Sequence, residues 1–334
     1  MMEKDRLLDA IHLKPVDRTP VASFTQTGTI ELMKLSCSYW PDAHREPEKM
    51  ATLALAAHDH GGFESVRIPF GIHTEAEALG CRVNYYEGTH DRTPVVETPV
   101  NESIIDWGAD PKKSPSTKTV IDSVRILRQK ASSVPIIVGV LAPFSVTGHI
   151  RSVAKLMREL IKSPDDVKRT MELSCEFLLK YIESLDAAGA DIITLVEPTA
   201  TGENLGPILF EKFAFPSLEL LTKACKKPVI LHICGNSTSI LQTMMKTGAK
   251  GISIDHKVDM AKAKQLVGDT GCVIGNINPV ELMMKKEDDI RKEALKVLAE
   301  HVNVVAPGCG LAPRTPTNNL RTLTTTVKGY AVKE

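Results

Sequence analysis

The stretch LHICGN, at residues 231 to 236, places a histidine and a cysteine two positions apart at the end of an apolar run. Residues two apart in a β-strand point to the same face, so His232 and Cys234 would share one side of a sheet. A further cysteine, Cys309, lies in the glycine-flanked turn VAPGCG near the end of the chain. One imidazole and two thiolates form a three-ligand zinc set, which leaves a coordination position open for a substrate. We predict that these three residues bind zinc.

The composition of this ligand set indicates the type of reaction. Two thiolates and a neutral imidazole leave Zn²⁺ with a local charge near zero, which weakens the metal as a Lewis acid. A site that polarises a carbonyl or activates water usually has neutral histidines or one carboxylate instead. A thiolate-rich site holds a substrate thiol deprotonated at neutral pH and leaves its sulfur electron-rich enough to attack. The expected reaction is therefore the alkylation of a thiol.

Eight short apolar runs, separated by segments of helical periodicity, can position these residues. They are PVASF (20 to 24), ESVRIPF (64 to 70), PIIVGV (135 to 140), DIITLVE (191 to 197), PVILHIC (228 to 234), GISID (251 to 255), CVIGNI (272 to 277) and VNVVAPG (302 to 308). Helix-like segments lie between them, and several end near a glycine. Alternating strands and helices imply parallel strands, and eight such units predict an α/β fold, the closed (β/α)8 TIM barrel.

The remaining segments extend this barrel. Residues 3 to 12, approximately, predict an N-terminal helix, and the region from 71 to 134 is too long for one helix. Within it, NYYEGTHDRTPVVETPV suggests an inserted hairpin or an irregular excursion after the second strand. No linker, repeat or low-complexity segment divides the chain, so we expect residues 1–334 to form a single domain. A doubly wound open sheet competes with the barrel, but no glycine-rich dinucleotide fingerprint follows the first strand.

In such a barrel the chemistry lies at the C-terminal ends of the strands. The later strands end in Glu197 on the fourth, His232 and Cys234 on the fifth, Asp255 and His256 on the sixth, Asn276 on the seventh and Cys309 on the eighth. Because successive strands are neighbours around a barrel, His232 and Cys309 come together although they are far apart in sequence. The other cysteines fit better as small buried apolar residues than as ligands. They are Cys37, Cys81, Cys175, Cys225 and Cys272.

The bulk composition argues against several classes of protein. Lys and Arg number 41, as do Asp and Glu, which leaves no excess charge for binding nucleic acid or an anionic membrane surface. No run approaches the roughly 18 apolar residues of a membrane span, and the N-terminal MMEKDRLLDAIHLKP lacks the apolar stretch of a secretion signal. Seven scattered cysteines in a chain of 334 residues favour reduced thiols over a disulfide framework. We therefore expect a cytoplasmic protein.

Five motifs carry a resemblance to a known family. They are TPVASFTQTG at 19 to 28, LHICGN at 231 to 236, GISID at 251 to 255, GNINP at 275 to 279 and VAPGCGLAP at 305 to 313. Together they resemble the uroporphyrinogen decarboxylase superfamily and, within it, the zinc-dependent methylcobalamin:coenzyme M methyltransferases of methylotrophic methanogenesis. The resemblance covers nearly the whole chain. Its most specific part is HxC followed by GCG, because the decarboxylases share the barrel but need no metal.

The resemblance implies roles for particular residues. It makes His232, Cys234 and Cys309 the ligands of Zn²⁺, which would bind coenzyme M through its thiol. The thiolate would take the methyl group of methylcobalamin carried by a partner corrinoid protein. An acidic residue would fill the fourth zinc position until the thiol arrives, with Asp255 as the candidate and Glu197 as the alternative. The candidates for binding the sulfonate of coenzyme M, chosen by strand position, are Arg67, His149 and Asn276.

Three other functions stay open. A decarboxylase of tetrapyrrole acetates has the same fold, but that family carries an arginine-rich segment after the first strand. This chain has no arginine between Arg18 and Arg45. A thiolate-rich zinc site also suits another thiol acceptor, such as homocysteine. The third alternative is a corrinoid-binding module without catalysis, and the three-ligand site argues against it.

Overall fold

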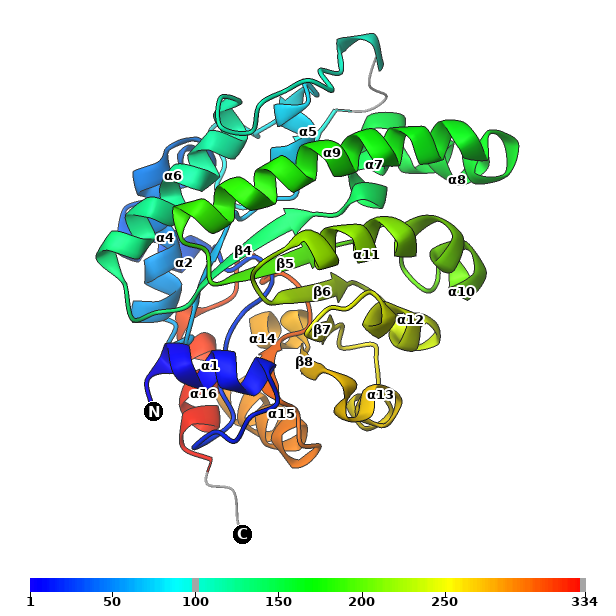
Figure 1. Ribbon diagram of the computed structural model, residues 1–334. Helices are drawn as coiled ribbons and strands as arrows, with labels where there is room; N and C mark the ends of the chain where they lie inside the picture. Colours follow the sequence, from blue (N-terminus) through cyan, green and yellow to red (C-terminus); the bar gives the residue numbers. More distant parts are fainter. Residues whose placement is uncertain (98–101, 331–334) are drawn as a thin grey trace.

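A parallel sheet of seven strands forms the centre of the protein (Figure 1). The computed structural model describes residues 1–97 and 102–330. The strands, each parallel to the next in the order given, are β1 (Val66–Ile68), β4 (Ile136–Leu141), β5 (Ile192–Val196), β6 (Val229–Ile233), β7 (Gly251–Ile254), β8 (Cys272–Ile277) and β9 (Val304–Pro307). Six of these strands fall within the apolar runs that predict them, and β4 extends one residue beyond its run, to Leu141. The first apolar run of the chain supplies none of the seven.

That first run, residues 20 to 24, forms an isolated parallel bridge between Val21 and Val305 rather than a regular strand. The run lies between β9 and β1, the two edge strands of the sheet. On the β1 side, the backbone N–H of Glu64, just before β1, donates to the carbonyl oxygen of Val21 (2.8 Å). The backbone N–H of Val21 donates to the Glu64 carboxylate (2.9 Å), and Pro20 has no N–H to donate. The Glu64 carboxylate therefore takes the place of a backbone carbonyl as the partner of Val21. This explains why the first apolar run does not form the regular strand that the sequence predicts.

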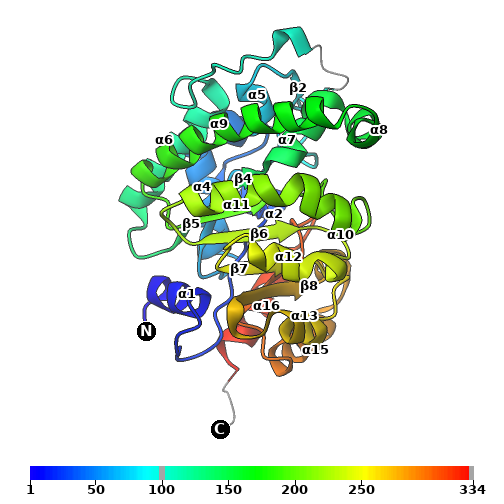
Figure 2. The same ribbon diagram turned by 45° about the vertical axis from the view of Figure 1, so that its right-hand side comes forward.

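Helices surround the sheet, and most follow the segments of helical periodicity (Figures 1 and 2). The helices before β5 are α1 (Glu3–Ile11), α2 (Ile30–Ser36), α3 (Asp42–Arg45), α4 (Pro47–Asp59), α5 (Thr74–Ala78), η1 (Glu102–Ile104), α6 (Pro115–Lys130), α7 (Pro143–Arg151), α8 (Val153–Lys162) and α9 (Pro164–Ala188). Those after β5 are α10 (Gly206–Leu209), the π-helical turn η2 (Phe210–Ala214), α11 (Phe215–Ala224), η3 (Thr238–Ile240), α12 (Leu241–Lys246), α13 (Met260–Val267), η4 (Gly268–Thr270), α14 (Pro279–Met284), α15 (Glu287–Ala299) and α16 (Thr317–Lys328).

The two faces of the strands belong to two different apolar clusters. On β6, Val229, Leu231 and Ile233 pack in the larger cluster, together with the surrounding helices. Ile230, on the opposite face, packs in a smaller cluster with the first inward residues of the other strands. Because side chains alternate along a strand, His232 lies on the same inner face as Ile230. The alternation therefore directs the histidine into the interior of the curled sheet.

Helix α1 closes one end of this interior. Leu7 and Ile11 are buried and pack in the smaller cluster with Ile137, Ile192 and Ile230, which lie near the beginnings of their strands. The helix confirms the N-terminal helix expected over about residues 3 to 12. Since α1 covers the N-terminal ends of the strands, the C-terminal ends are left to form the mouth of the site.

The segment between β1 and α6 carries a small second sheet. β2 (Val83–Asn84) and β3 (Val95–Val96) pair antiparallel and, apart from Val83, lie in the segment 84 to 100, for which an inserted hairpin is expected. Residues 98–101, which include the end of that segment, lie outside the described residues. The helix α5 precedes the two short strands, so the segment also includes helical structure.

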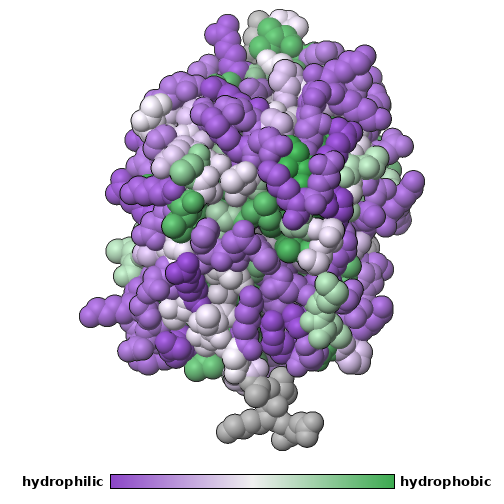
Figure 3. Space-filling view, turned by 90° about the vertical axis from the view of Figure 1, so that its left-hand side faces the viewer, coloured by the Kyte–Doolittle hydropathy of each residue, from purple (hydrophilic) through white to green (hydrophobic). Residues whose placement is uncertain are grey.

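The outer surface is mainly polar. On the face drawn in Figure 3, hydrophilic side chains cover most of the surface, and apolar side chains appear in small separate groups. Within the described residues, no helix combines the length and the apolar character needed to cross a lipid bilayer.

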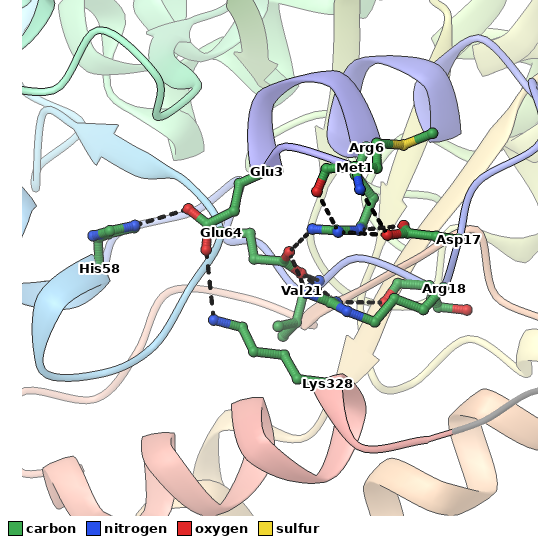
Figure 4. A network of polar contacts seen from close by, with 10 residues as sticks. Met1, Glu3, Arg6, Asp17, Arg18, Val21, His58, Glu64 and Lys328 are labelled. Carbon is green, nitrogen blue, oxygen red and sulfur yellow. Dashed lines mark hydrogen bonds and ion pairs between the residues drawn. The ribbon is translucent and has the colours of Figure 1, made fainter.

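A buried carboxylate joins α1 to the strand edge (Figure 4). Glu64 is fully buried and accepts hydrogen bonds from Arg6 (2.6 Å), Arg18 (2.7 Å) and the backbone of Val21 (2.9 Å). Arg6 also pairs with Asp17 at 2.6 Å. This network fixes the N-terminal segment against the region where residues 20 to 24 lie between β9 and β1.

Candidate metal centre

Three side chains that the sequence predicts as zinc ligands meet at the C-terminal ends of the strands. His232 lies in β6, Cys234 follows its last residue, and Cys309 lies in the turn after β9. The Nε2 atom of His232 is 3.3 Å from the Sγ atom of Cys234, which is 3.5 Å from the Sγ atom of Cys309. All three ligand atoms lie within 4.8 Å of one another.

These separations fit a tetrahedral zinc site. Ligand atoms bound at about 2.0–2.3 Å from one Zn²⁺ lie roughly 3.3–3.8 Å apart. The Nδ1 atom of His232 is 3.1 Å from the carbonyl oxygen of Ser253, which can only accept a hydrogen bond. A proton on Nδ1 would satisfy this oxygen and leave the lone pair of Nε2, on the side of the sulfurs, for a metal. Histidine ligands of metals are commonly oriented by such a second hydrogen bond.

The two thiols share one hydrogen bond, and it separates their acidities. The hydrogen bond between them lowers the pKa of Cys309 below its usual range and raises the pKa of Cys234 above it. Burial acts against ionisation of both sulfurs. Cys309 therefore ionises more readily than Cys234, and a bound cation would favour ionisation of Cys234 as well.

Glycines give the ligand turns their shape. Gly235, directly after Cys234, has φ +75°, a backbone conformation that L side chains rarely adopt. Gly308 lies so close to the end of β7 that an added Cβ would be 2.7 Å from the backbone nitrogen of His256. The glycine before Cys309 thus lets the turn after β9 approach its neighbour.

A cavity of about 200 Å³ adjoins the three ligands. Its walls include Arg67 from β1 and the apolar side chains Phe70, Ile72, Val196 and Pro198. Arg67 is thus the sulfonate candidate that the structure brings to the ligands. Burial lowers the pKa of its guanidinium to about 10, which still leaves it cationic at neutral pH.

The other two sulfonate candidates lie elsewhere. His149 is on α7, and it is not among the residues that line the cavity in the described part of the chain. The amide of Asn276 donates to the backbone oxygens of Asp255 (3.3 Å) and Val258 (2.7 Å). Asn276 borders a separate hollow of about 590 Å³ between α13 and α15. The structure thus brings neither side chain to the cavity that Arg67 lines in the described part of the chain.

Asp255 braces the turns around the centre. One carboxylate oxygen accepts the backbone N–H of Gly235 and the other that of Lys257, both at 3.0 Å. Among the described residues, the carboxylate is not part of the cluster of ligand atoms formed by the histidine and the two cysteines. The structure thus places Asp255 beside the centre, with both oxygens already engaged.

Glu197 is also engaged away from the ligands. It is fully buried, and its carboxylate accepts the backbone N–H of Phe144 (3.1 Å) and the hydroxyl of Ser145. Both partners lie at the start of α7, so Glu197 joins the end of β5 to that helix. Burial raises its pKa to about 8. The described residues do not place it in the ligand cluster.

Two further residues of the cavity wall are absent from the sequence predictions. Gln26 lies in the TPVASFTQTG motif, and Thr93 lies in the segment between the two short strands. Both also border a second hollow of about 430 Å³, which Tyr86, Arg92 and Cys309 line as well. The motif around Gln26 could have pointed to that residue, whereas Thr93 lies in a segment without any periodic pattern.

Comparisons with known proteins agree with this arrangement. The family model described as uroporphyrinogen decarboxylase (URO-D) matches residues 2–330. The chain belongs to the uroporphyrinogen decarboxylase family. The methylcobamide:CoM methyltransferase MtaA of Methanosarcina barkeri is 36% identical over 326 residues, 96% of each chain. The methylcobamide:CoM methyltransferase MtbA of Methanosarcina acetivorans is 36% identical over 337 residues, 98% of each chain.

A solved structure of a similar protein has the same overall fold. The structure described as a methyltransferase from Methanosarcina mazei superimposes with a TM-score of 0.93, at 34% identity and over 98% of both chains. Within the family, the chain therefore resembles the methyltransferases over almost its whole length.

Proposed function

We propose that this member of the uroporphyrinogen decarboxylase family transfers a methyl group from a methylated corrinoid to the thiol of coenzyme M. Zn²⁺ would be held by His232, Cys234 and Cys309, and the methylcobalamin would be carried by a partner corrinoid protein. The observation that carries the proposal is the meeting of these three ligands with the cation of Arg67 at one small cavity. Such a cavity suits a short thiol with an anionic end.

The ligand set determines the chemistry that the metal would supply. When bound, Zn²⁺ would lower the pKa of the substrate thiol while the two thiolate ligands keep its sulfur nucleophilic. His232 is held for this role by the carbonyl oxygen of Ser253. Arg67 would pair with the sulfonate, and Phe70, together with the other apolar wall residues, would keep water from the sulfur.

The transfer itself needs no acid or base at the methyl carbon. The thiolate sulfur attacks the methyl group in line, the new S–C bond forms as the Co–C bond breaks, and the bonding pair stays with the corrinoid. The hollow of about 430 Å³ that shares Cys309 with the cavity offers a route for this approach. Arg92 and Tyr86, on the segment between β2 and β3, would lie beside the arriving corrinoid protein.

The size of the cavity beside the ligands supports a small thiol as the acceptor. Sites for drug-sized ligands occupy about 300–1,000 Å³. The space of about 200 Å³ beside the ligands instead suits a molecule with a few non-hydrogen atoms. Homocysteine is also small enough, so the choice between these thiols needs an experiment.

Three features of the fold belong to the same proposal. Residues 20 to 24 would act as the eighth strand that completes the barrel, next to β9 and β1. The whole chain would form one catalytic domain, with the segment between β1 and α6 as an insertion at the mouth. We also propose a cytoplasmic location, on the grounds of composition given above.

The function can be tested with free methylcobalamin as the donor. Purified protein loaded with Zn²⁺ should demethylate methylcobalamin when coenzyme M is present, and the change in cobalamin absorbance reports the transfer. Cys309→Ala should lower the rate by about a hundredfold or more, because a zinc ligand is lost. Methyl transfer to homocysteine but not to coenzyme M would make homocysteine the acceptor. Decarboxylation of uroporphyrinogen without methyl transfer would contradict the proposal.

A further inference from the structure

The guanidinium of Arg67 lies inside the barrel with donors that the protein leaves unused. Arg67 is only 3% exposed and lies on β1 between Val66 and Ile68, whose side chains pack toward the helices. Its Nη1 donates to the carbonyl oxygen of Pro69, whereas Nε has no hydrogen-bond partner among the described residues. A buried cation with free donors is costly unless an anion joins it.

The protein supplies no direct ion-pair partner for this cation among its described residues, although the charges of Glu75 and of a Cys309 thiolate act on it. Glu75 is the acidic residue whose charge acts most strongly on Arg67, but its carboxylate accepts the backbone N–H of Leu141 at 2.9 Å. No ion pair within 4.0 Å joins Arg67 to a carboxylate in the described part of the chain. Since Arg67 also lines the cavity of the three ligands, the unpaired cation faces the place where a substrate binds.

A glycine on the neighbouring strand provides the space for this cation. Gly139 lies within β4, between Val138 and Val140, and the register pairs β4 directly with β1. A Cβ added at Gly139 would lie 2.7 Å from the Cζ atom of Arg67, and closer still to Nη2. The guanidinium therefore rests against the bare backbone of β4. Because the strand at Gly139 is regular, an alanine there would conflict mainly with the guanidinium.

We infer that Gly139 is a specificity-determining residue: by leaving the space in which the guanidinium of Arg67 rests on β4, it makes the cavity select short thiols that end in an anion. The inference rests on the proposed function for the identity of the thiol. Any side chain at Gly139 would displace the guanidinium from its place against β4. The anionic end would then lose its partner while the three metal ligands stay in place.

Ethanesulfonate tests the anion site without the thiol chemistry. It has the anionic end of coenzyme M but no sulfur to bind zinc, and calorimetry measures its affinity directly. Gly139→Ala and Arg67→Ala should each weaken ethanesulfonate binding by about tenfold or more. In the Arg67→Ala background, Gly139→Ala should have no further effect, because the group it displaces is gone. Gly148→Ala is the matched control, since its Cβ would meet no atom closer than 3.5 Å.

Two outcomes would overturn the inference. Gly139→Ala could bind ethanesulfonate as tightly as the wild type, or it could weaken binding by the same factor with and without Arg67. If Gly139→Ala alone does not fold, the cycle is measured with Arg67→Lys, whose flexible ammonium can leave the space above β4. The double variant should then fold and bind ethanesulfonate as weakly as Arg67→Lys alone, and a further loss would contradict the inference.

Methyl transfer separates this inference from the proposed function. With methylcobalamin as donor, Gly139→Ala should raise KM for coenzyme M by about tenfold and leave kcat/KM for 2-mercaptoethanol, which has no anion, unchanged. A wild-type protein that transfers methyl groups equally well to both thiols would overturn the selection by charge but keep the function. A protein that binds ethanesulfonate as described but methylates no thiol would overturn the proposed function and keep the anion site.

Discussion

His232 and Cys234 reach the same cavity because alternate positions along and just after β6 face one side. That part of the site could be predicted from the sequence, since HxC at a strand end defines both the end and the face. The inward direction of Arg67 could be predicted in the same way, because Arg67 lies within a regular strand; its role in binding the sulfonate stays a prediction. For these three residues, strand periodicity predicts the face on which the side chain lies.

Two other candidate positions were less predictable. His149 lies on α7, eight residues after β4 ends, and Asn276, within β8, uses its amide to hold the backbone after β7. The direction of His149 depends on the path of the chain between strand and helix, and that of Asn276 depends on hydrogen bonds with distant backbone. The hydrogen bonds that the carboxylates of Asp255 and Glu197 accept from backbone N–H groups also join residues far apart in the sequence. For that reason they could not be predicted from the sequence.

The first prediction concerns the two cysteine ligands. Cys234→Ala should lose bound zinc, with an affinity at least about a hundredfold lower, because two remaining ligands cannot complete the site. Zinc content after gel filtration, measured by mass spectrometry, checks this. Cys225→Ala is the control, since Cys225 lies at the end of α11, and it should keep one zinc per chain. A Cys234→Ala protein with full zinc content would remove Cys234 from the centre.

The second prediction concerns Asp255. Asp255→Asn should keep the zinc, because the carboxylate accepts two backbone N–H groups and is not part of the ligand cluster in the described residues. The amide can accept at only one side, so the unfolding free energy should fall by about 1–3 kcal/mol. Urea unfolding and zinc content measured together test this. Loss of zinc without loss of stability would instead make Asp255 the fourth ligand.

At the scale of elements, the junction of β5 and α7 depends on one buried carboxyl group. The pKa of Glu197 is raised to about 8 by burial, whereas its ordinary value is 4.5. Between these two values the unfolded chain loses the proton and the folded chain keeps it. The folded state therefore loses stability as the pH rises from about 4.5 to about 8, which is the sign expected for a raised acid.

Glu197→Gln should remove this dependence. In chelator-treated protein, the unfolding free energy of the wild type should fall relative to the variant by up to about 1.4 kcal/mol per pH unit in this window. Urea unfolding of both proteins at several pH values measures the difference, and other buried acids such as Glu75 cancel in it. Parallel curves for the two proteins would show that Glu197 is ionised in the folded state throughout.

The element scale also shows where periodicity stops being informative. Long helices such as α9 and α15 follow their apolar patterns closely, because a repeated face leaves little choice of conformation. The short helices α2 and α3, and the strands β2 and β3, have no such repeat and were not predicted individually. Their conformation depends on packing against the rest of the protein.

At the scale of the whole molecule, the Glu64 network connects α1, the first apolar run and β1. Glu64→Gln should lower the unfolding free energy by about 3–5 kcal/mol, because it leaves Arg6 and Arg18 without their shared buried partner. The midpoint of urea unfolding tests this. Glu48→Gln, which removes only an exposed pair with Lys130, should change the free energy by less than about 1 kcal/mol. Equal effects of both variants would contradict the role of the network.

The most direct test of the account is zinc K-edge X-ray absorption of the purified, zinc-loaded protein with and without coenzyme M. We predict a first shell that contains two sulfurs and the nitrogen of His232, and a third sulfur when the thiol is added. Such a change would establish the metal centre and the acceptor together. A shell that does not change on adding coenzyme M, or a protein that binds no stoichiometric zinc, would contradict the proposed function.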